Sequence, residues 1–249
     1  MASQTKVREM IAKNNAKKGG LSDKIVPIIL AIISAISILT TIAILFTLLT
    51  ETITFFTRVP LSKFFLSGTW NPTGSSPEFG IWALIIGTLK ITVIATIVAV
   101  PIGLGAAIYL NEYASDRSRR IIKPILEILA GIPTIVFGFF ALTFVTPILR
   151  NLIPNLGEFN SISPGIVVGI MIVPMITSMS EDAMSSVPDK IREGAFGLGA
   201  TKFEVATKVV LPAATSGVVA SIVLGISRAI GETMIVSLAA GSSPDRKSV

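Results

Sequence analysis

Two charged side chains, Arg228 and Glu232, interrupt an otherwise apolar run from Ser216 to Ala240. If this run crosses a membrane as one helix, Arg228 lies near the bilayer centre, where an arginine costs about 2.5 to 3.5 kcal/mol on insertion scales. Glu232 then follows one turn later on the same face, about 6 Å along the axis, and can compensate the charge. Two interpretations stay open: an ion pair that locks helices together, or an oxyanion site in which the planar guanidinium binds oxygen atoms and the carboxylate accepts a hydrogen bond.

Three hydroxyl side chains are further candidate ligands for an oxyanion: Thr134, Ser227 and Thr233. Each hydroxyl can equally bond to a carbonyl of its own helix, which is the commoner arrangement. The chain contains no Cys and no His, so disulfides, thiol chemistry, imidazole metal ligands and His-based catalysis are excluded. We therefore predict a binding or transport site with no catalytic residues and no metal.

The composition is that of a membrane protein. The 249 residues are 51% hydrophobic and only 14% charged, with a mean hydropathy of +0.77, far from the balance of a soluble domain. About 20 apolar residues in a helix cross about 30 Å of hydrocarbon. Five runs are long enough, which predicts an all-α, polytopic helical bundle with spans near residues 25–50, 80–109, 125–149, 162–180 and 216–240.

The basic residues predict how the spans are oriented. Lys and Arg concentrate in an arm over residues 1–24 and in the loops 110–124 and 181–215, whereas 51–79 and 150–161 hold only Arg58, Lys63 and Arg150. Because positive charge stays on the cytoplasmic side, the N-terminus and both basic loops are predicted to be cytoplasmic. The net charge of +6 thus reports topology and gives no support for nucleic-acid binding. The arm 1–24 precedes one transmembrane domain over residues 25–249.

Small residues recur at every fourth position of the last span, at Gly217, Ser221, Gly225 and Ala229. Such a face lets a neighbouring backbone approach closely, so it predicts a helix-packing surface.

The cytoplasmic loop before this span, residues 188–212, is longer than a bare connection requires. Pro188 and Asp189 suit the start of a short helix, and Gly199 can end it in a left-handed conformation. Thr201 and Glu204 have the spacing of a capping box, which predicts a second helix that stops at Pro212.

This loop resembles the cytoplasmic signature of permease subunits of ATP-binding-cassette (ABC) importers: Glu-Ala-Ala, three residues, Gly, nine residues, then Ile-x-Leu-Pro. Here Glu193-Gly194-Ala195 precedes Gly199 and Val209-Val210-Leu211-Pro212 at the same spacing, with Gly194 in place of Ala and Val209 in place of Ile. The resemblance implies a coupling helix that docks on a separate ATPase through Arg192, Glu193, Gly194, Ala195, Gly199, Leu211 and Pro212. A re-entrant or amphipathic surface helix is the alternative.

No phosphate-binding GxxxxGK[ST] loop is present in the chain, so it cannot bind nucleotide in the Walker manner. The resemblance accordingly implies that ATP and Mg²⁺ bind to the partner ATPase, and that this chain is a transporter subunit with no cofactor of its own, not an enzyme.

Within the ABC importers the chain most resembles phosphate-uptake permeases of the PstC type, from about residue 80 to 236. The resemblance rests on "LAGIPTIVFGFF", "GIMIVPMITSMSEDAMSSVP" and "SRAIGETMIV". It implies the type I ABC importer permease fold in a prokaryotic cell membrane and the passage of inorganic phosphate past Arg228 and Glu232. The implied partners are a second permease of the PstA type, two ATPases of the PstB type and an external phosphate-binding protein of the PstS type.

Several alternatives remain at this stage. Permeases of the PstA type are similar around Arg228 to Thr233, although Met234 and the basic arm favour PstC. The substrate could be another oxyanion, such as molybdate or sulfate. An ion-coupled secondary transporter or a channel could use Arg228 and Glu232 as a relay. Members of the family continue to a sixth span, whereas this sequence ends at "GSSPDRKSV", so we expect an external, altered or truncated C-terminus and an incomplete gate.

Overall fold

The computed structural model describes residues 21–72 and 76–241, with side chains from residue 25 onward. The chain divides into two compact units, Met1–Leu61 and Ser62–Val249, and each is considered by itself.

The first unit contains helix α2 (Leu21–Arg58). Its side chains from Ile25 to Thr54 are exposed in the isolated chain. Apolar residues surround the whole helix rather than forming one stripe, as in a helix that spans a membrane. The predicted span 25–50 is therefore a helix suited to lipid or to a partner helix, and it continues to Arg58. The arm predicted over residues 1–24 lies outside the described residues, except that α2 already begins at Leu21.

The second unit begins with short elements that lead into the bundle. Helix α3 (Leu61–Leu66) is followed by two-residue strands, β1 (Trp70–Asn71) and β2 (Glu78–Phe79), which pair antiparallel. The indole Nε1 of Trp82 donates to the Phe65 carbonyl at 2.7 Å and ties α3 to the start of the next helix.

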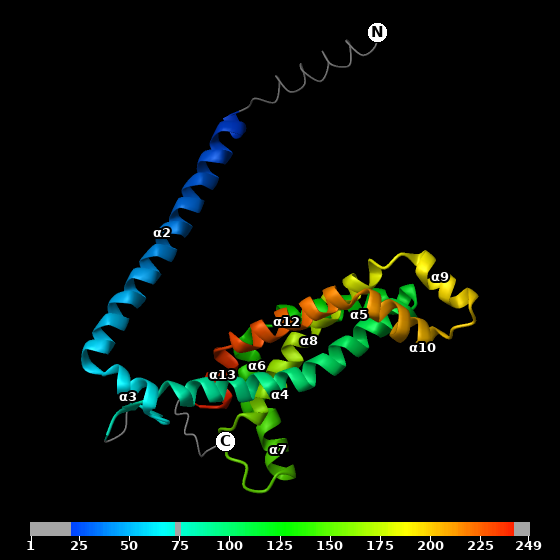
Figure 1. The fold of residues 1–249 in the computed structure, drawn as a ribbon. Helices are drawn as coiled ribbons and strands as arrows, with labels where there is room; N and C mark the ends of the chain where they lie inside the picture. Colours follow the sequence, from blue (N-terminus) through cyan, green and yellow to red (C-terminus); the bar gives the residue numbers. More distant parts are fainter. Residues whose placement is uncertain (1–20, 73–75, 242–249) are drawn as a thin grey trace. The chain divides into compact units, whose positions relative to one another are not determined.

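Helix α8 (Ile162–Ser185) is the central element of the second unit (Figure 1). It packs against α4 (Ile81–Ile108) and α12 (Thr215–Ile230), and 67% of its most apolar window is buried, against 33% for α4. Close packing of α4 on α8 needs small residues: a Cβ added at Gly169 would lie 2.9 Å from the Ala95 carbonyl oxygen. Thr177 adds a hydrogen bond to the Gly103 carbonyl at 3.2 Å.

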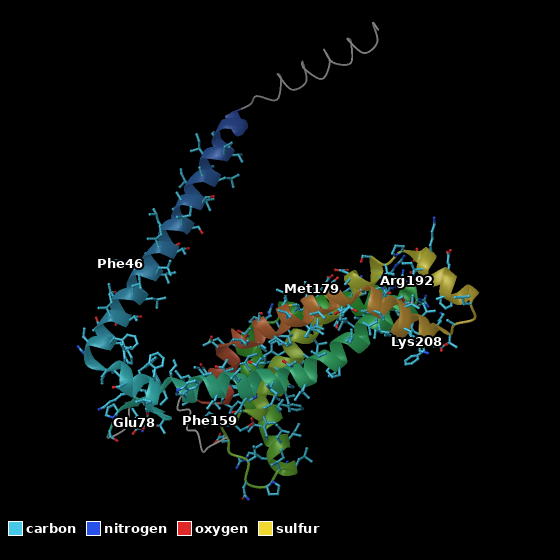
Figure 2. All side chains as sticks on the ribbon, viewed as in Figure 1. Phe46, Glu78, Phe159, Met179, Arg192 and Lys208 are labelled. Atoms are coloured by element: carbon cyan, nitrogen blue, oxygen red, sulfur yellow. The ribbon has the colours of Figure 1, made fainter. Side chains whose placement is uncertain are left out.

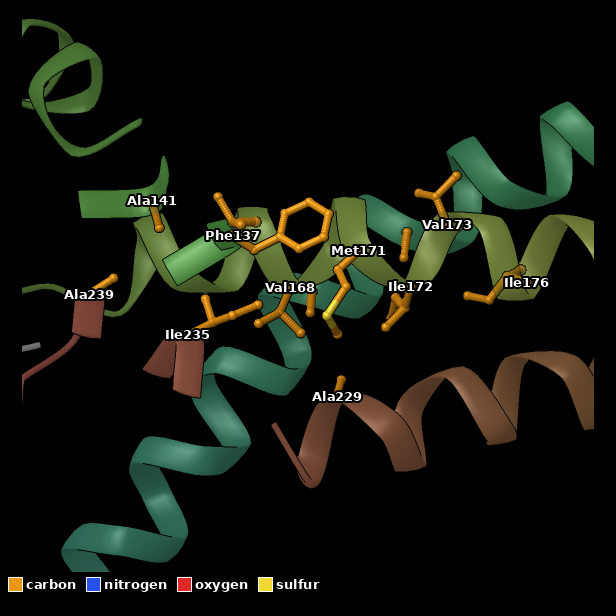
Figure 3. Packing of buried hydrophobic residues seen from close by; sticks show 13 residues of the cluster. Phe137, Ala141, Val168, Met171, Ile172, Val173, Ile176, Ala229, Ile235 and Ala239 are labelled. Atoms are coloured by element: carbon orange, nitrogen blue, oxygen red, sulfur yellow. The ribbon is translucent and has the colours of Figure 1, made fainter. Parts of the chain in front are cut away.

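The main apolar core lies around α8, where side chains of α4, of α12 and of residues 137–141 and 235–239 pack against it (Figure 3). Val168, Met171 and Ile172 of α8 point toward Phe137, Ala229 and Ile235 from three other elements. The shared cluster holds these elements to one face of α8.

The small-residue face of α12 packs on α8, as predicted. Ser221 and Ser180 share a buried hydrogen bond at 2.6 Å, and a Cβ added at Gly217 would lie 2.5 Å from the Ala183 Cβ. Gly225 and Ala229 continue the same buried stripe.

The third predicted span begins later than expected. Residues 125–131 belong to an amphipathic helix, α5 (Asp116–Gly131), and the span itself covers Thr134–Leu152. Pro133 explains the break, because it has no N–H to donate and disfavours a helical conformation at the residue before it. The span consists of α6 (Thr134–Phe140), a π-helical turn η2 (Ala141–Val145) and α7 (Thr146–Leu152).

The prediction of one continuous fifth span over residues 216–240 is wrong. Helix α12 ends at Ile230, and α13 (Met234–Ala239) begins after a three-residue break. Within the described residues, four helices can cross a membrane, or five if Lys202–Ala213 and Thr215–Ile230, which meet at 76°, form one bent span. The predicted external C-terminus, residues 242–249, lies outside the described residues.

Candidate functional site

The loop between α8 and α12 folds as a helix, a sharp turn and a second helix. Helix α9 (Asp189–Gly197) begins directly after Pro188, as predicted. It ends in a Schellman motif, in which Ala200 N donates to the Ala195 carbonyl and Gly199 N to the Phe196 carbonyl. Gly199 has a φ of +84°, the left-handed conformation that the sequence predicts for it.

The predicted capping box is also present. Thr201 and Glu204 exchange side-chain and backbone hydrogen bonds at the start of α10 (Lys202–Glu204). The backbone N–H of Thr201, followed by Lys208 at 3.0 Å, lowers the pKa of Glu204 to about 2. The helix continues through η3 (Val205–Val210) and α11 (Leu211–Ala213), so it ends one residue after Pro212 rather than at it.

A second apolar cluster fixes this loop to the bundle. Val205, Val210 and Ala214 pack with Met184 and Val187 at the end of α8. Ala195 and Leu211 rest against the same cluster, so these two predicted docking residues support the loop from inside.

Around its turn, the outer surface of the loop presents large apolar side chains and open glycines. Leu198 is 91% exposed and Phe203 67%, and Phe196 is also exposed. Nothing lies within 4 Å of a Cβ added at Gly194, Gly197 or Gly199. We call these three apolar residues and three glycines the docking tip; in Figure 1 it lies around α9 and α10, at one end of the bundle.

Of the docking tip, Gly194 and Gly199 were among the predicted docking residues, whereas Gly197 and the three apolar side chains were not. The available signal was an apolar residue, Leu198, between Gly197 and Gly199 at a predicted helix end, because exposed apolar groups can mark interaction sites. Of the other predicted docking residues, Glu193 and Pro212 are exposed, whereas the Arg192 side chain is only 14% exposed and bonds within the chain.

The second candidate site is the break between α12 and α13. Arg228 lies in the last turn of α12 and is exposed in the isolated chain, although residues 216–227 before it carry no charge. Glu232 lies in the break, where its Oε1 accepts from Met234 N at 3.1 Å and from Ile235 N at 3.2 Å.

The expected Arg228–Glu232 pair is therefore not formed. Among the described residues, no ion pair or hydrogen bond was found that involves the Arg228 guanidinium. The helix ends between the two residues, so Glu232 caps α13 instead of following Arg228 on one helix face. Arg228 therefore lies beside a break in the helix, and the amides at the start of α13 are already bound by the Glu232 carboxylate.

The three hydroxyl residues differ in their surroundings. Ser227 Oγ donates to the Val223 carbonyl at 2.8 Å, and Thr233 Oγ1 to the Gly231 carbonyl at 3.4 Å, so both bond to nearby backbone. Thr134 begins α6, which packs on α13, so its helix adjoins the one that Glu232 caps.

One charged contact was missed entirely by the sequence reasoning. Glu181 of α8 is 3% exposed, and its Oε2 lies 2.7 Å from Lys123 Nζ of α5. The two residues line a cavity of about 190 Å³ between these helices. No spacing rule relates residues 58 positions apart, so only the folded structure identifies this pair. No cluster of three or more potential metal ligands occurs among the described residues.

The family of binding-protein-dependent transport system inner membrane components matches residues 99–247, a segment that includes the docking tip and Arg228. The chain belongs to this family. It is therefore a multi-pass membrane protein of a family of transport-system components, as predicted.

Individual relatives agree. The chain is 38% identical over 182 residues to the probable ABC transporter permease protein YqgH of Bacillus subtilis, covering 73% of this chain and 59% of that protein. It is 37% identical over 200 residues to the phosphate transport system permease protein PstC of Haemophilus influenzae, covering 73% and 63%. The resemblance to PstC is thus confirmed, and the chain spans about three-fifths of the length of these relatives.

Structural similarity supports the fold. A chain from inward-facing conformations of the MetNI methionine ABC transporter superposes with a TM-score of 0.54 at 22% identity, covering 61% of this chain and 71% of that one. The predicted fold, an all-α polytopic bundle of the ABC importer permease kind, is confirmed.

Proposed function

We propose that this chain is a permease subunit of an ATP-driven importer of inorganic phosphate. The observation that carries the proposal is the 35–38% identity to phosphate transport system permease proteins named PstC from several bacteria. The free Arg228 guanidinium supports an anionic substrate, since an unpaired arginine in an apolar helix is costly unless water, a partner or a ligand meets it.

In this proposal the docking tip binds a separate ATPase. Leu198 and Phe203 are the apolar side chains that would fill a groove on the partner, and the open glycines let its backbone approach closely. A second permease of the PstA type, ATPases of the PstB type and a phosphate-binding protein of the PstS type would complete the system. ATP and Mg²⁺ would bind to the ATPases, so this chain would need no cofactor.

Uptake of labelled phosphate tests the proposal. The chain is co-expressed with PstA-, PstB- and PstS-type partners in cells that lack their own phosphate importers. We expect uptake that stops when ATP is depleted and when residues 190–212 are deleted, and that unlabelled sulfate or molybdate leaves unchanged.

Two outcomes would refute it. Competition by sulfate or molybdate, with no phosphate uptake, would make the chain a permease for another oxyanion. Uptake that follows an ion gradient and survives both ATP depletion and deletion of the loop would make it a secondary transporter or channel.

A further inference from the structure

Arg192 lies in the exposed helix α9, yet its side chain is turned inward (Figure 2). Only 14% of the side chain is accessible, and all five N–H donors of the guanidinium have acceptors. The residue therefore connects the docking tip to other elements of the bundle rather than to solvent.

Two of the acceptors are backbone carbonyls at the end of α8. Nη1 donates to the Val187 carbonyl at 2.6 Å, and Nη2 to the Met184 carbonyl at 2.7 Å. Met184 lies in the last turn of α8, where the carbonyls carry the negative end of the helix dipole that a cation stabilises, and Val187 follows two residues after the helix ends. Arg192 thus joins α9 to the cytoplasmic end of the central helix.

Two further acceptors of the Arg192 guanidinium lie in the turn that follows α4. Nε donates to Glu112 Oε1 at 3.2 Å and Nη2 to Asn111 Oδ1 at 3.2 Å, both in the π-helical turn η1 (Tyr109–Tyr113) that continues α4. The Glu112 side chain is only 9% exposed, so this contact is shielded from solvent. Arg192 therefore joins α9 to α4 and α8 at once.

Additional bonds hold the same junction together. Asn111 Nδ2 donates to Ser185 Oγ at 2.8 Å, which links η1 directly to α8. Arg119 donates from Nε to the Leu110 carbonyl and from Nη2 to the Asn111 carbonyl, each at 2.7 Å. These bonds hold the η1 turn in place. A displacement of α9 would therefore act through Arg192 on a fixed contact.

We infer that Arg192 is a positioning residue that fixes the docking tip to the ends of α4 and α8, so that movement of a docked partner is passed to both helices. The inference rests on the proposed function for the identity of that partner. It assigns Arg192 to transmission of movement and not to contact with the ATPase, because its donors are already used within the chain.

Two variants test the inference in the assembled complex of both permeases and the ATPases. Arg192→Lys keeps the charge but has three donors at a single nitrogen, which cannot reach acceptors on both sides. Glu112→Ala removes the carboxylate acceptor on the receiving side and leaves Arg192 in place. Lys190→Gln is the matched control, since Lys190 is an exposed cation of the same helix with no hydrogen bond or ion pair found among the described residues.

We expect both test variants to copurify with the ATPase as well as the wild type does. The number of phosphate ions transported per ATP hydrolysed should fall about two- to thirtyfold, the range typical of mutations along a coupling network. The double variant should be little worse than either single one, because both remove one contact network. The control should retain the wild-type ratio.

Amide hydrogen exchange on the purified chain separates this inference from the proposed function, because it needs no ATPase. Amides of α9 should exchange faster in Arg192→Lys than in Lys190→Gln, with the middle of α8 unchanged. Three results for Arg192→Lys would each overturn the inference: wild-type exchange of α9, a wild-type transport ratio, or loss of ATPase binding. If Arg192→Lys fails to fold, Glu112→Ala decides: a wild-type ratio in that variant overturns the inference. Failure of the wild-type chain to bind an ATPase would refute the proposed function instead.

Discussion

At the scale of single residues, Glu232 shows how far a spacing rule can be trusted. The four-residue spacing to Arg228 predicts a same-face pair only if the helix continues, and it ends at Ile230. Gly231 is a poor helix former, and Glu232 instead accepts hydrogen bonds from two backbone amides of α13. Sequence reasoning located both charges but could not predict the break that separates them.

Substitutions at Glu232 should distinguish a cap from a pure charge role. Glu232→Gln keeps an oxygen that can accept from Met234 N, so its stability should stay near that of the wild type. Glu232→Ala loses the cap and should lower the free energy of unfolding by about 0.5 to 2 kcal/mol. Denaturation of the purified protein in detergent measures both; equal stability of all three proteins would contradict the assignment.

At the scale of elements, the repeat of small residues on α12 was sufficient to predict its packing face. Gly225→Leu should be destabilising by about 1 to 3 kcal/mol, because even a Cβ there would lie 2.9 Å from the Ile176 side chain. Gly87→Leu on α4 is the control, since nothing lies within 4 Å of its added Cβ. Thermal unfolding in detergent compares them, and equal losses would contradict the packing described for α12 and α8.

Gly194 and Gly199, in the loop between α8 and α12, should respond differently to substitution. Gly194 is helical with open space around it, so Gly194→Ala should stabilise the free chain by up to about 1 kcal/mol. Gly199 has a φ of +84°, so Gly199→Ala should cost about 1 to 2 kcal/mol. Unfolding of the free chain measures both effects; the opposite order would show that the turn is wrongly placed.

The apolar side chains of the docking tip should matter for association and not for folding. Leu198→Ser and Phe203→Ser should each weaken ATPase binding by more than about 1 kcal/mol, roughly fivefold or more, as is common for central interface residues. Leu66→Ser is the control, because Leu66 is 84% exposed but lies outside the loop. Titration of the purified permease complex with ATPase measures the affinity, and unchanged affinity in both test variants would exclude the tip as the dock.

At the scale of the whole molecule, hydropathy was enough to predict a helical membrane protein, and turn and capping residues predicted the two short helices between α8 and α12. Hydropathy could not predict which helix is central, because α8 is no more hydrophobic than α4 and only packing shows that α8 is the more buried. The inward turn of Arg192 was equally hidden, because its partners at Asn111 and Glu112 are about 80 positions away in sequence. Long-range contacts of this kind leave no local pattern.

If this chain is a phosphate permease, we expect Arg228 to contact phosphate on the ATP-driven pathway. The most direct test of this contact is ATP-dependent uptake of labelled phosphate into vesicles that hold the assembled complex, comparing Arg228→Gln with Arg150→Gln, a variant that removes an exposed arginine at the end of α7. We predict that Arg228→Gln abolishes uptake while ATPase binding and Arg150→Gln uptake remain at wild-type levels. Wild-type uptake by Arg228→Gln would contradict the account.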